Sequence, residues 1–230
     1  MTVLVTRPYA QAERTARRLD ALGHDSLIAP LLEIVPQPWA TPEMTPDLIL
    51  ITSANAVRAA IPPTLLDIPV LAMGSASAAA ARDAGFMSVE TSNANGAAAL
   101  YRLAAKGAPG RALHLCGRDL TAAGTPPGLH LERITTYRAE LLPLSADAAS
   151  ALADGGINMT LLYSQRTALH FLAELERLDI PRANQHVTLL GIRPPGFPPG
   201  GWASMTLASA PTEDSLFAAA NLLHRNHSAA

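Results

Sequence analysis

The sequence predicts an α/β protein with two similar lobes, each built on a parallel sheet flanked by helices. Short β-branched runs alternate with Ala-, Leu- and Arg-rich runs along the chain, which is typical of parallel α/β sheets. Three short segments recur in the same order in the two halves of the chain. Two proline-bounded extended segments stand at the edges of the middle block, as two connections between lobes would.

Runs of apolar, often β-branched residues predict the strands. The first covers residues 2–6 and stops before Pro8. Further strands are predicted at residues 47–52, 69–73, 87–91, 110–116, 158–163, 187–191 and 202–208, with longer extended stretches at 26–35 and 129–140. The proline-rich residues 36–38 and 42–46 predict loops.

Apolar residues spaced three or four positions apart predict the first helix at residues 11–22, and Gly23 ends it. Further helices are predicted at residues 54–61, 75–84, 96–106, 146–153, 166–178 and 213–223. Helices that follow strands in this way favour parallel sheets covered by helices.

An internal repeat with a period near half the chain length indicates two lobes of similar topology. A solenoid would need at least three shorter units. The pairs of similar segments are residues 47–57 with 158–168, 69–74 with 186–191, and 2–7 with 112–118.

The two extended, proline-bounded segments predict that the lobes are discontinuous in sequence. Residues 1–33 and 144–230 form the first lobe, and residues 45–132 form a second lobe inserted in it. Residues 34–44 and 133–143 are the predicted strands of a two-stranded β-ladder linker. We expect such a connection to leave a cleft lined by both lobes.

The composition excludes several classes of protein. The chain has 230 residues and a formal net charge of −2, so no overall field attracts nucleic acid or a membrane surface. Cys116 is the one cysteine, which rules out an intramolecular disulfide and a multi-cysteine metal site. Lys106 is the one lysine, so arginines, hydroxyls or backbone N–H groups must hold any anion. Without a spanning run or signal peptide, a cytoplasmic protein is expected.

Ligands of parallel α/β sheets bind at the carboxyl ends of the strands. The loops predicted there are rich in hydroxyls, arginines and helix N-termini, which suits a ligand with several carboxylates. The candidate ligand-binding residues are Arg7, Thr52, Ser53, Ala54, Asn55, Ser75, Ala76, Ser77, Arg118, Ser164, Gln165 and Arg166. Any of the Ser, Thr or Asn side chains can instead cap the helix that follows it.

Tyr137, in the second linker strand, is the best ionisable candidate. A phenol keeps its proton at neutral pH and can donate the proton or a hydrogen bond. The alternative role for Tyr137 is packing on one face of the ladder, and Tyr163 is expected in the core. The chain contains no Gly-rich dinucleotide fingerprint, P-loop or nucleophile elbow, which disfavours a nucleotide-dependent enzyme, and no metal site is predicted.

Several short motifs occur in a characteristic order along nearly the whole chain. They are Val5-Thr6-Arg7-Pro8, Pro-Leu-Leu-Glu-Ile at 30–34, Ile-Thr-Ser-Ala-Asn-Ala-Val at 51–57, Val-Leu-Ala-Met-Gly-Ser-Ala-Ser at 70–77, Cys116-Gly117-Arg118, Tyr137-Arg138-Ala139-Glu140 and Leu-Tyr-Ser-Gln-Arg-Thr-Ala at 162–168. Each motif is weak by itself, but the ordered set resembles the uroporphyrinogen-III synthase family.

The resemblance implies two α/β lobes joined by a two-stranded ladder, and a cyclising hydro-lyase of haem and other tetrapyrrole biosynthesis. Such an enzyme dehydrates and cyclises hydroxymethylbilane with inversion of ring D, giving uroporphyrinogen III. The resemblance further implies a monomer without a cofactor that binds hydroxymethylbilane and makes transient contact with hydroxymethylbilane synthase. By the same resemblance, Tyr137 gives a proton to the leaving hydroxyl, and the hydroxyl-bearing candidates line the cleft.

Residues 191–201 depart from the family's pattern. Their four prolines and their glycines prevent the helix that the family has there, so one hydroxyl contact of the family is missing. Arg193 is a candidate substitute for that contact. This departure supports the alternative function, a two-lobed small-molecule-binding or regulatory protein that kept the scaffold without the activity.

Overall fold

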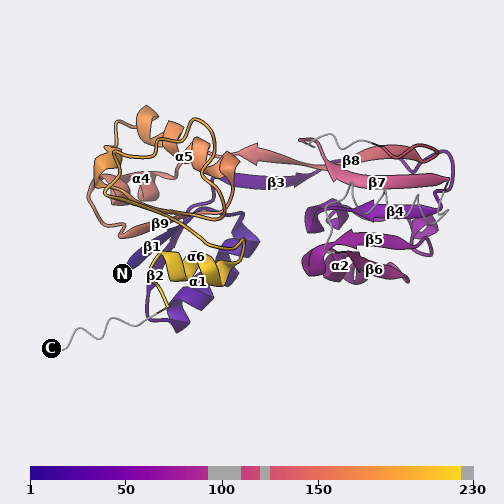
Figure 1. Cartoon of the computed structure of the whole chain (residues 1–230), viewed down its shortest axis with the longest axis horizontal. Coiled ribbons are helices and arrows are strands. Elements are labelled where there is room, and N and C mark those ends of the chain that lie inside the picture. The colour runs from indigo at the N-terminus through magenta and orange to yellow at the C-terminus, as the bar shows by residue number, and fades with distance from the viewer. Residues whose placement is uncertain (93–109, 120–124, 224–230) are drawn as a thin grey trace. The chain divides into compact units, whose positions relative to one another are not determined.

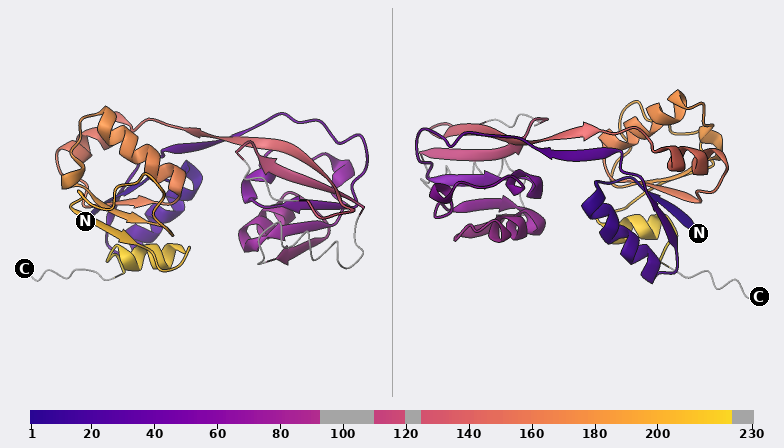
Figure 2. Two further views of the ribbon diagram at one scale, coloured as in Figure 1. Left: turned by 45° about the horizontal axis from the view of Figure 1, so that its top comes forward. Right: turned by 180° about the vertical axis from the view of Figure 1, so that it is seen from behind.

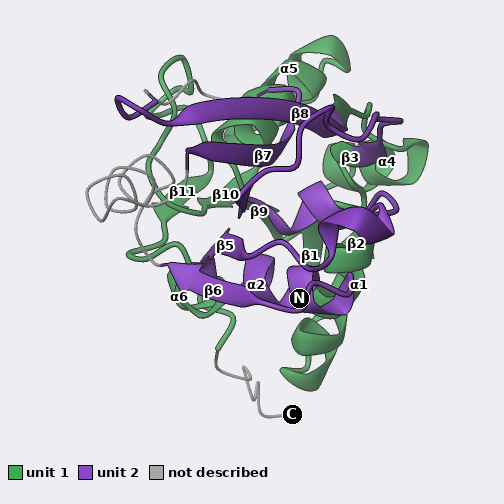
Figure 3. Cartoon of the chain, turned by 90° about the vertical axis from the view of Figure 1, so that its right-hand side faces the viewer, with its two compact units in different colours: residues 1–33, 140–230 green, residues 34–139 purple. Residues whose placement is uncertain are grey.

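The structure, a computed structural model, describes residues 1–92, 110–119 and 125–223. The chain forms two compact units, coloured green and purple in Figure 3. Unit 1 consists of Met1–Glu33 together with Glu140–Ala230, and unit 2 of Ile34–Ala139. Each unit has its own sheet.

Unit 1 contains a five-stranded sheet in the order β11-β10-β9-β1-β2, with parallel neighbours throughout. Its strands are β1 (Thr2–Val5), β2 (Asp25–Ile28), β9 (Met159–Leu162), β10 (His186–Leu189) and β11 (Ser204–Leu207). Its helices are α1 (Tyr9–Ala21), α4 (Ala146–Ala153), α5 (Gln165–Arg177), η3 (Arg182–Asn184) and α6 (Glu213–Ala219). Helices α4 and α5 cover one face of the sheet, and α1 and α6 cover the other (Figure 1).

The alternation of side chains along β1 explains the two layers of helices. Leu4 belongs to the apolar cluster that contains Phe171 of α5, whereas Val3 and Val5 belong to the cluster that contains Phe217 of α6. All of these side chains are fully buried. Successive residues of a strand point to opposite faces, so this central strand is apolar on both sides, as parallel sheets require.

Unit 2 contains a six-stranded sheet in the order β3-β8-β7-β4-β5-β6. Its strands are β3 (Leu32–Pro36), β4 (Leu48–Ile51), β5 (Val70–Met73), β6 (Val89–Ser92), β7 (Arg111–Gly117) and β8 (His130–Leu141). The pairs β8–β7, β7–β4, β4–β5 and β5–β6 are parallel. Its described helices are η1 (Ala54–Val57), η2 (Pro63–Leu65) and α2 (Gly74–Asp83), and Ile49 and Leu113 of the sheet share a buried cluster with Ala78 and Ala81 of α2.

The internal repeat corresponds to three neighbouring strands in each unit. These strands are β7-β4-β5 in unit 2 and β1-β9-β10 in unit 1. The segments that resemble one another in sequence therefore occupy equivalent places in the two sheets. The prediction of two similar lobes with parallel sheets flanked by helices is confirmed.

The chain passes between the units in β3 and β8, which can be followed in both views of Figure 2. The N–H of Gln37 donates to the carbonyl of Thr136 (2.8 Å), and the N–H of Leu142 donates to the carbonyl of Leu31 (3.0 Å). These two hydrogen bonds show that the segments run in opposite directions. The predicted boundaries of the lobes and linker strands stay predictions.

The helix predicted at residues 54–61 is wrong, because only Ala54–Val57 is helical, as a 3₁₀ turn. Pro62 disfavours the helical region at Ile61, which shortens the available segment.

Other elements differ from prediction mainly at their ends. The extended stretch at 26–35 is two strands separated around Pro30, which has no N–H to offer a ladder. The last helix ends at Ala219, because Asn221 adopts a left-handed backbone with φ +56°. The helix predicted at residues 96–106 lies outside the described residues.

Candidate functional site

Four neighbouring strands of unit 2 bring many of the predicted site residues to one edge of the sheet, the edge toward which the carboxyl ends of these parallel strands point. Following the order β8-β7-β4-β5, this edge carries Tyr137, Arg118, residues 52–55 and Ser75. Neighbouring strands lie about 4.8 Å apart, so the four strand ends span roughly 15 Å. We call these residues the unit 2 edge.

The hydroxyl of Thr52 lies 3.0 Å from Nε2 of His114, on the neighbouring strand β7. His114 is 5% exposed. Burial, together with the positive charge of Arg133, lowers the pKa of His114 to about 4. The ring is therefore neutral at neutral pH, and the pair can share a hydrogen bond in either direction, depending on the tautomer.

Ser53 caps the short helix that follows β4. Its Oγ accepts a hydrogen bond from the N–H of Asn55 at 3.2 Å. The capping role, which the sequence left open for such residues, is thus the observed role of Ser53. Thr52 and Asn55 on either side of it are half-buried.

Helix α2 begins directly after β5, at Gly74, whose φ of +77° is in the left-handed region that favours glycine. No described side chain caps its first turn. Ser75 and Ala76 are exposed, so this turn offers backbone N–H groups and one hydroxyl at the unit 2 edge. Ser77 is 4% exposed and belongs to the buried side of the helix.

The ring of Tyr137 lies directly against Gly117, the last residue of β7. A Cβ built on Gly117 would stand 2.6 Å from Cζ and 2.9 Å from the hydroxyl oxygen of Tyr137. The amide of Arg118 donates to the carbonyl of Tyr137 at 3.0 Å. The ring also packs against the apolar cluster of unit 2, so Tyr137 is a half-buried side chain that has the packing role and lies beside the end of β7.

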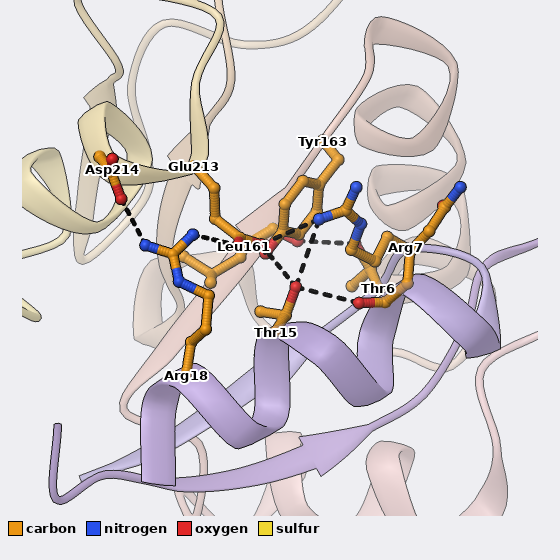
Figure 4. Close-up of polar contacts among 9 residues, drawn as sticks. Thr6, Arg7, Thr15, Arg18, Leu161, Tyr163, Glu213 and Asp214 are labelled. Carbon is orange, nitrogen blue, oxygen red and sulfur yellow. Dashed lines mark hydrogen bonds and ion pairs between the residues drawn. The ribbon is translucent and has the colours of Figure 1, made fainter. Parts of the chain in front are cut away.

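In unit 1, Arg7 follows β1 and is held by a network that Figure 4 draws. Its Nη1 donates to Oε1 of Glu213 at 2.9 Å, and its guanidinium lies 4.4 Å above the ring of Tyr163. The same Oε1 accepts the hydroxyls of Thr15 (2.5 Å) and Tyr163 (3.3 Å). Arg18 binds the other carboxylate oxygen of Glu213 at 2.5 Å.

This network fixes the protonation of its members. Burial by itself raises the pKa of Glu213, but hydrogen bonds from Thr15 and Arg18 and the charges of Arg7 and Arg18 outweigh it and hold that pKa below its usual value. Burial raises the pKa of Tyr163 well above its usual value. Glu213 is therefore ionised, and Tyr163 keeps its proton at neutral pH.

Ser164, Gln165 and Arg166 follow β9, the neighbour of β1 in the sheet. The Oγ of Ser164 accepts the N–H of Thr167 at 3.1 Å, so Ser164 is the N-cap of α5. Gln165 and Arg166 are exposed in its first turn. The carboxyl ends of unit 1 thus gather Arg7 with this group, while Arg7 already has an internal partner.

Residues 191–201 contain no helix, as their prolines and glycines predict. Phe197 is buried and stacks on Trp202 with ring centroids 5.0 Å apart, and Nε1 of Trp202 donates to the carbonyl of Pro198 at 3.1 Å. Nη1 of Arg193 donates to the carbonyl of Phe197. One of the N–H groups of Arg193 is therefore used in a hydrogen bond within this loop.

A cavity of about 630 Å³ lies at the opposite end of the unit 2 sheet. Arg111 and His130 line it where β7 and β8 begin, and Trp39, Pro42 and Met44 line it from the segment before β4. None of the predicted site residues lines this cavity. The cavity and the unit 2 edge are therefore separate features.

Within the described ranges, no group of three or more His, Cys, Asp or Glu side chains is arranged to hold a metal ion. In the same part of the chain, no helix combines the length and the apolar character that crossing a membrane requires.

The roles of His114 and Glu213 are not predicted from the sequence. A histidine inside the apolar run of β7 is a usable signal, because a buried imidazole needs a hydrogen-bond partner. Glu213 gives no comparable signal. Its partner Arg7 is 206 positions away, and only the fold brings the two together.

Three comparisons place the chain among known proteins. A family model described as uroporphyrinogen-III synthase HemD matches residues 13–217. The crystal structure of uroporphyrinogen-III synthetase from Helicobacter pylori is similar, with 17% identity and a TM-score of 0.60, over 97% of this chain and 100% of that chain. A mutant uroporphyrinogen III synthase from the extremely thermophilic bacterium Thermus thermophilus has 17% identity and a TM-score of 0.45, over 83% and 85% of the two chains. No curated protein matches the chain. The similarity to the Helicobacter structure shows a shared fold.

Proposed function

This chain belongs to the uroporphyrinogen-III synthase family, and on that premise we propose which residues carry its reaction. The protein is a cyclising hydro-lyase of tetrapyrrole (haem) biosynthesis. It dehydrates hydroxymethylbilane and closes the macrocycle with ring D inverted, giving uroporphyrinogen III. The observation that carries this conclusion is the family match, which covers residues 13–217 and hence most of both units.

The substrate's eight carboxylates need hydrogen-bond donors and positive charge. The unit 2 edge offers the hydroxyl of Ser75, the N–H groups of the first turn of α2, and the exposed Arg118. The hydroxyl of Thr52 can also donate to a carboxylate when Nε2–H of His114 donates to Thr52. Charge-assisted hydrogen bonds from such groups are the strong way to hold carboxylates. We assign carboxylate binding in unit 2 to these groups and to the backbone and side chain of Asn55.

Tyr137 is the proposed proton donor. Its hydroxyl gives a proton to the hydroxyl of ring A's hydroxymethyl group, the C–O bond breaks, and water leaves behind an azafulvene cation. Ring D then attacks through its substituted α-carbon, and the spiro intermediate fragments and closes again with ring D turned over. The proton that ring D finally loses balances the proton that Tyr137 gave, so the net change is loss of one water.

Positioning is the larger part of the task. The linear substrate closes without an enzyme, but without inverting ring D, so the protein must hold it in the geometry that leads to inversion. Fixed donors along a rigid sheet edge suit this task. Support for the assignment is that Arg118 and residues 52–55 follow the adjacent strands β7 and β4, and that Tyr137 lies on the next strand, β8, opposite the last residue of β7.

Unit 1 carries the remaining part of the proposed set. Gln165 and Arg166 are exposed and are proposed to bind carboxylate groups. Arg7 contributes only those N–H groups that Glu213 leaves available, since its side chain is 26% exposed and one nitrogen is bound. Ser164 and Ser53 act first as helix caps, and the buried Ser77 is not retained in the set.

The test is an isomer-resolved assay. Purified protein is mixed with hydroxymethylbilane, the product is oxidised to porphyrin, and isomers I and III are separated. Isomer III formed in proportion to protein concentration is the expected result. Isomer I alone, formed at the rate of a protein-free control, would contradict the proposal.

The finer statements about partners remain proposals of the same kind. We propose a monomer that acts in the cytoplasm and receives its substrate through a transient contact with hydroxymethylbilane synthase. Light scattering of the purified chain tests the first part. A rise in isomer III yield when the two enzymes are mixed at low concentration tests the last.

A further inference from the structure

The register between β7 and β8 changes at the carboxyl end of their ladder. Cys116 pairs with Thr135, but the next residue, Gly117, pairs with Tyr137. Thr136 is therefore an extra residue on β8, which makes this a β-bulge. Without it, Tyr137 would stand opposite Arg118.

Hydrogen bonds fix the bulge on three sides. The buried hydroxyl of Thr136 donates to the carbonyl of Ala56, in the turn after β4, at 2.7 Å. Its carbonyl accepts the N–H of Gln37 at 2.8 Å, and the carbonyl of Tyr137 accepts the N–H of Arg118 at 3.0 Å. The backbone at the bulge therefore has little freedom to shift.

Gly117 leaves the space that the ring of Tyr137 occupies. An added Cβ would lie 2.6 Å from Cζ, 2.9 Å from Cε2 and 2.9 Å from the hydroxyl oxygen of Tyr137. Carbon atoms in contact stay about 3.5 Å apart or more, so the ring would have to move by roughly 1 Å. Gly117 is not among the glycines with positive φ, so alanine there acts through this contact alone.

We propose that Gly117 and the bulge at Thr136 are positioning residues, which together set where the hydroxyl of Tyr137 stands relative to the turn at residues 52–55. This inference rests on the proposed function, since it gives the proton donor its place. The bulge places Tyr137 opposite Gly117 instead of Arg118, and the absence of a side chain on Gly117 lets the hydroxyl end of the ring lie close to the backbone of β7. The link from Thr136 to Ala56 ties the ring to the turn after β4.

The chain offers matched controls for both residues. Gly110 precedes the same strand β7, lacks a positive φ, and an added Cβ there would meet Asp47 Oδ2 at an ordinary 3.9 Å. Thr135 is the exposed neighbour of Thr136 on β8. The informative pairs are therefore Gly117→Ala with Gly110→Ala, and Thr136→Val with Thr135→Val.

Steady-state kinetics of isomer III formation test the proposal. We expect Gly117→Ala to lower kcat about 10- to 100-fold with little change in KM or Tm, because a displacement near 1 Å of a reacting group has effects of that size. Thr136→Val should lower kcat, Thr136→Ser should restore it, and both controls should keep wild-type kcat. Wild-type kcat in Gly117→Ala, or equal losses in Gly110→Ala, would overturn the proposal.

A double substitution separates positioning from a general effect on folding. In a Tyr137→Ala background, the added Cβ meets no ring, so Gly117→Ala should cause no further loss of kcat. The same fold-loss in both backgrounds would contradict the proposed coupling.

A readout without activity separates this inference from the proposed function. The four tyrosines can be labelled with 3-fluorotyrosine, and Tyr137→Phe assigns the fluorine resonance of residue 137. Gly117→Ala should shift that resonance and Gly110→Ala should not; an unmoved resonance would overturn the positioning claim. If Tyr137→Phe instead keeps wild-type turnover, the proton-donor role fails, and the fluorine shift still decides where Gly117 holds the ring.

Discussion

Glu213 accepts a hydrogen bond from Arg7 across nearly the whole length of the chain, with 2.9 Å between Oε1 and Nη1 (Figure 4). The same carboxylate binds Thr15 and Arg18 of α1. Glu213 is the first residue of α6, so one side chain fastens the C-terminal helix to α1 and to the loop after β1. It therefore acts on the stability of unit 1 as well as on the position of Arg7.

Glu213→Gln is expected to lower the free energy of unfolding at pH 7 by about 1.5 kcal/mol, since hydrogen bonds to a charged acceptor are lost and Arg18 is partly exposed. The folded state lowers the pKa of Glu213, so its contribution is complete above the unfolded pKa and is lost as pH falls through the folded pKa. Urea unfolding at pH 7 and pH 3 measures this. Asp214→Asn, at a side chain that is 78% exposed, is the control, and its effect should be smaller. If both variants lost the same free energy of unfolding at both pH values, the role of Glu213 would be contradicted.

His114 should make the protein less stable as the solution becomes mildly acidic. Its pKa is lowered to about 4 in the folded state, against a usual value of 6.5. As pH falls below 6.5, His114 becomes protonated in the unfolded chain but stays neutral in the folded one. This difference lowers the free energy of unfolding by about 2–3 kcal/mol by pH 4. His114→Gln removes this titration, so its unfolding free energy should depend less on pH between 7 and 5. Parallel curves for the two proteins over that range would show that His114 is not the group responsible.

Tyr137→Phe should lower kcat about 100-fold, the lower part of the range for loss of a general acid, and should leave Tm unchanged because the ring still packs. Tyr9→Phe, at a tyrosine that is 61% exposed, is the matched control. The readout is the initial rate of isomer III formation with substrate in excess. Wild-type kcat in Tyr137→Phe would remove Tyr137 from the mechanism.

Arg118→Ala should raise KM about tenfold with a smaller effect on kcat, because a charge-assisted hydrogen bond to a substrate carboxylate contributes on the order of 1.4 kcal/mol. Arg118 is exposed, so the fold should be unaffected. Arg58→Ala, at another exposed arginine of unit 2, provides the control. Equal KM values for Arg118→Ala and the wild type would take Arg118 out of the binding set.

Much of the fold can be predicted from the chain, because hydrophobic periodicity and the internal repeat are local signals. The repeat indicated equivalent strands, and these are β7-β4-β5 and β1-β9-β10. The prediction of a helix at 54–61 is wrong because it rests on the apolar run alone. Pro62 disfavours helical backbone at the residue before it, and only Ala54–Val57 is helical. Local sequence sets the helical propensity of a segment, but a nearby proline can end the helix earlier than that propensity predicts.

The sequence predicts which loops contribute residues to the candidate site, but it does not predict how their side chains are arranged. The rule that ligands lie at the carboxyl ends of parallel strands predicts Thr52 and Arg118, whereas Tyr137 is predicted as an ionisable side chain of the second linker strand. Nothing local shows that Gly117 faces Tyr137, because that pairing depends on a bulge between strands. The same holds for the contact of His114 with Thr52, which depends on register.

Above all, this protein should invert ring D as it closes hydroxymethylbilane. The most direct measurement is the isomer composition of the product formed by purified wild-type protein, followed against protein concentration. We expect isomer III in excess, at an initial rate that rises linearly with protein concentration. Isomer I alone, at a rate independent of protein, would contradict it.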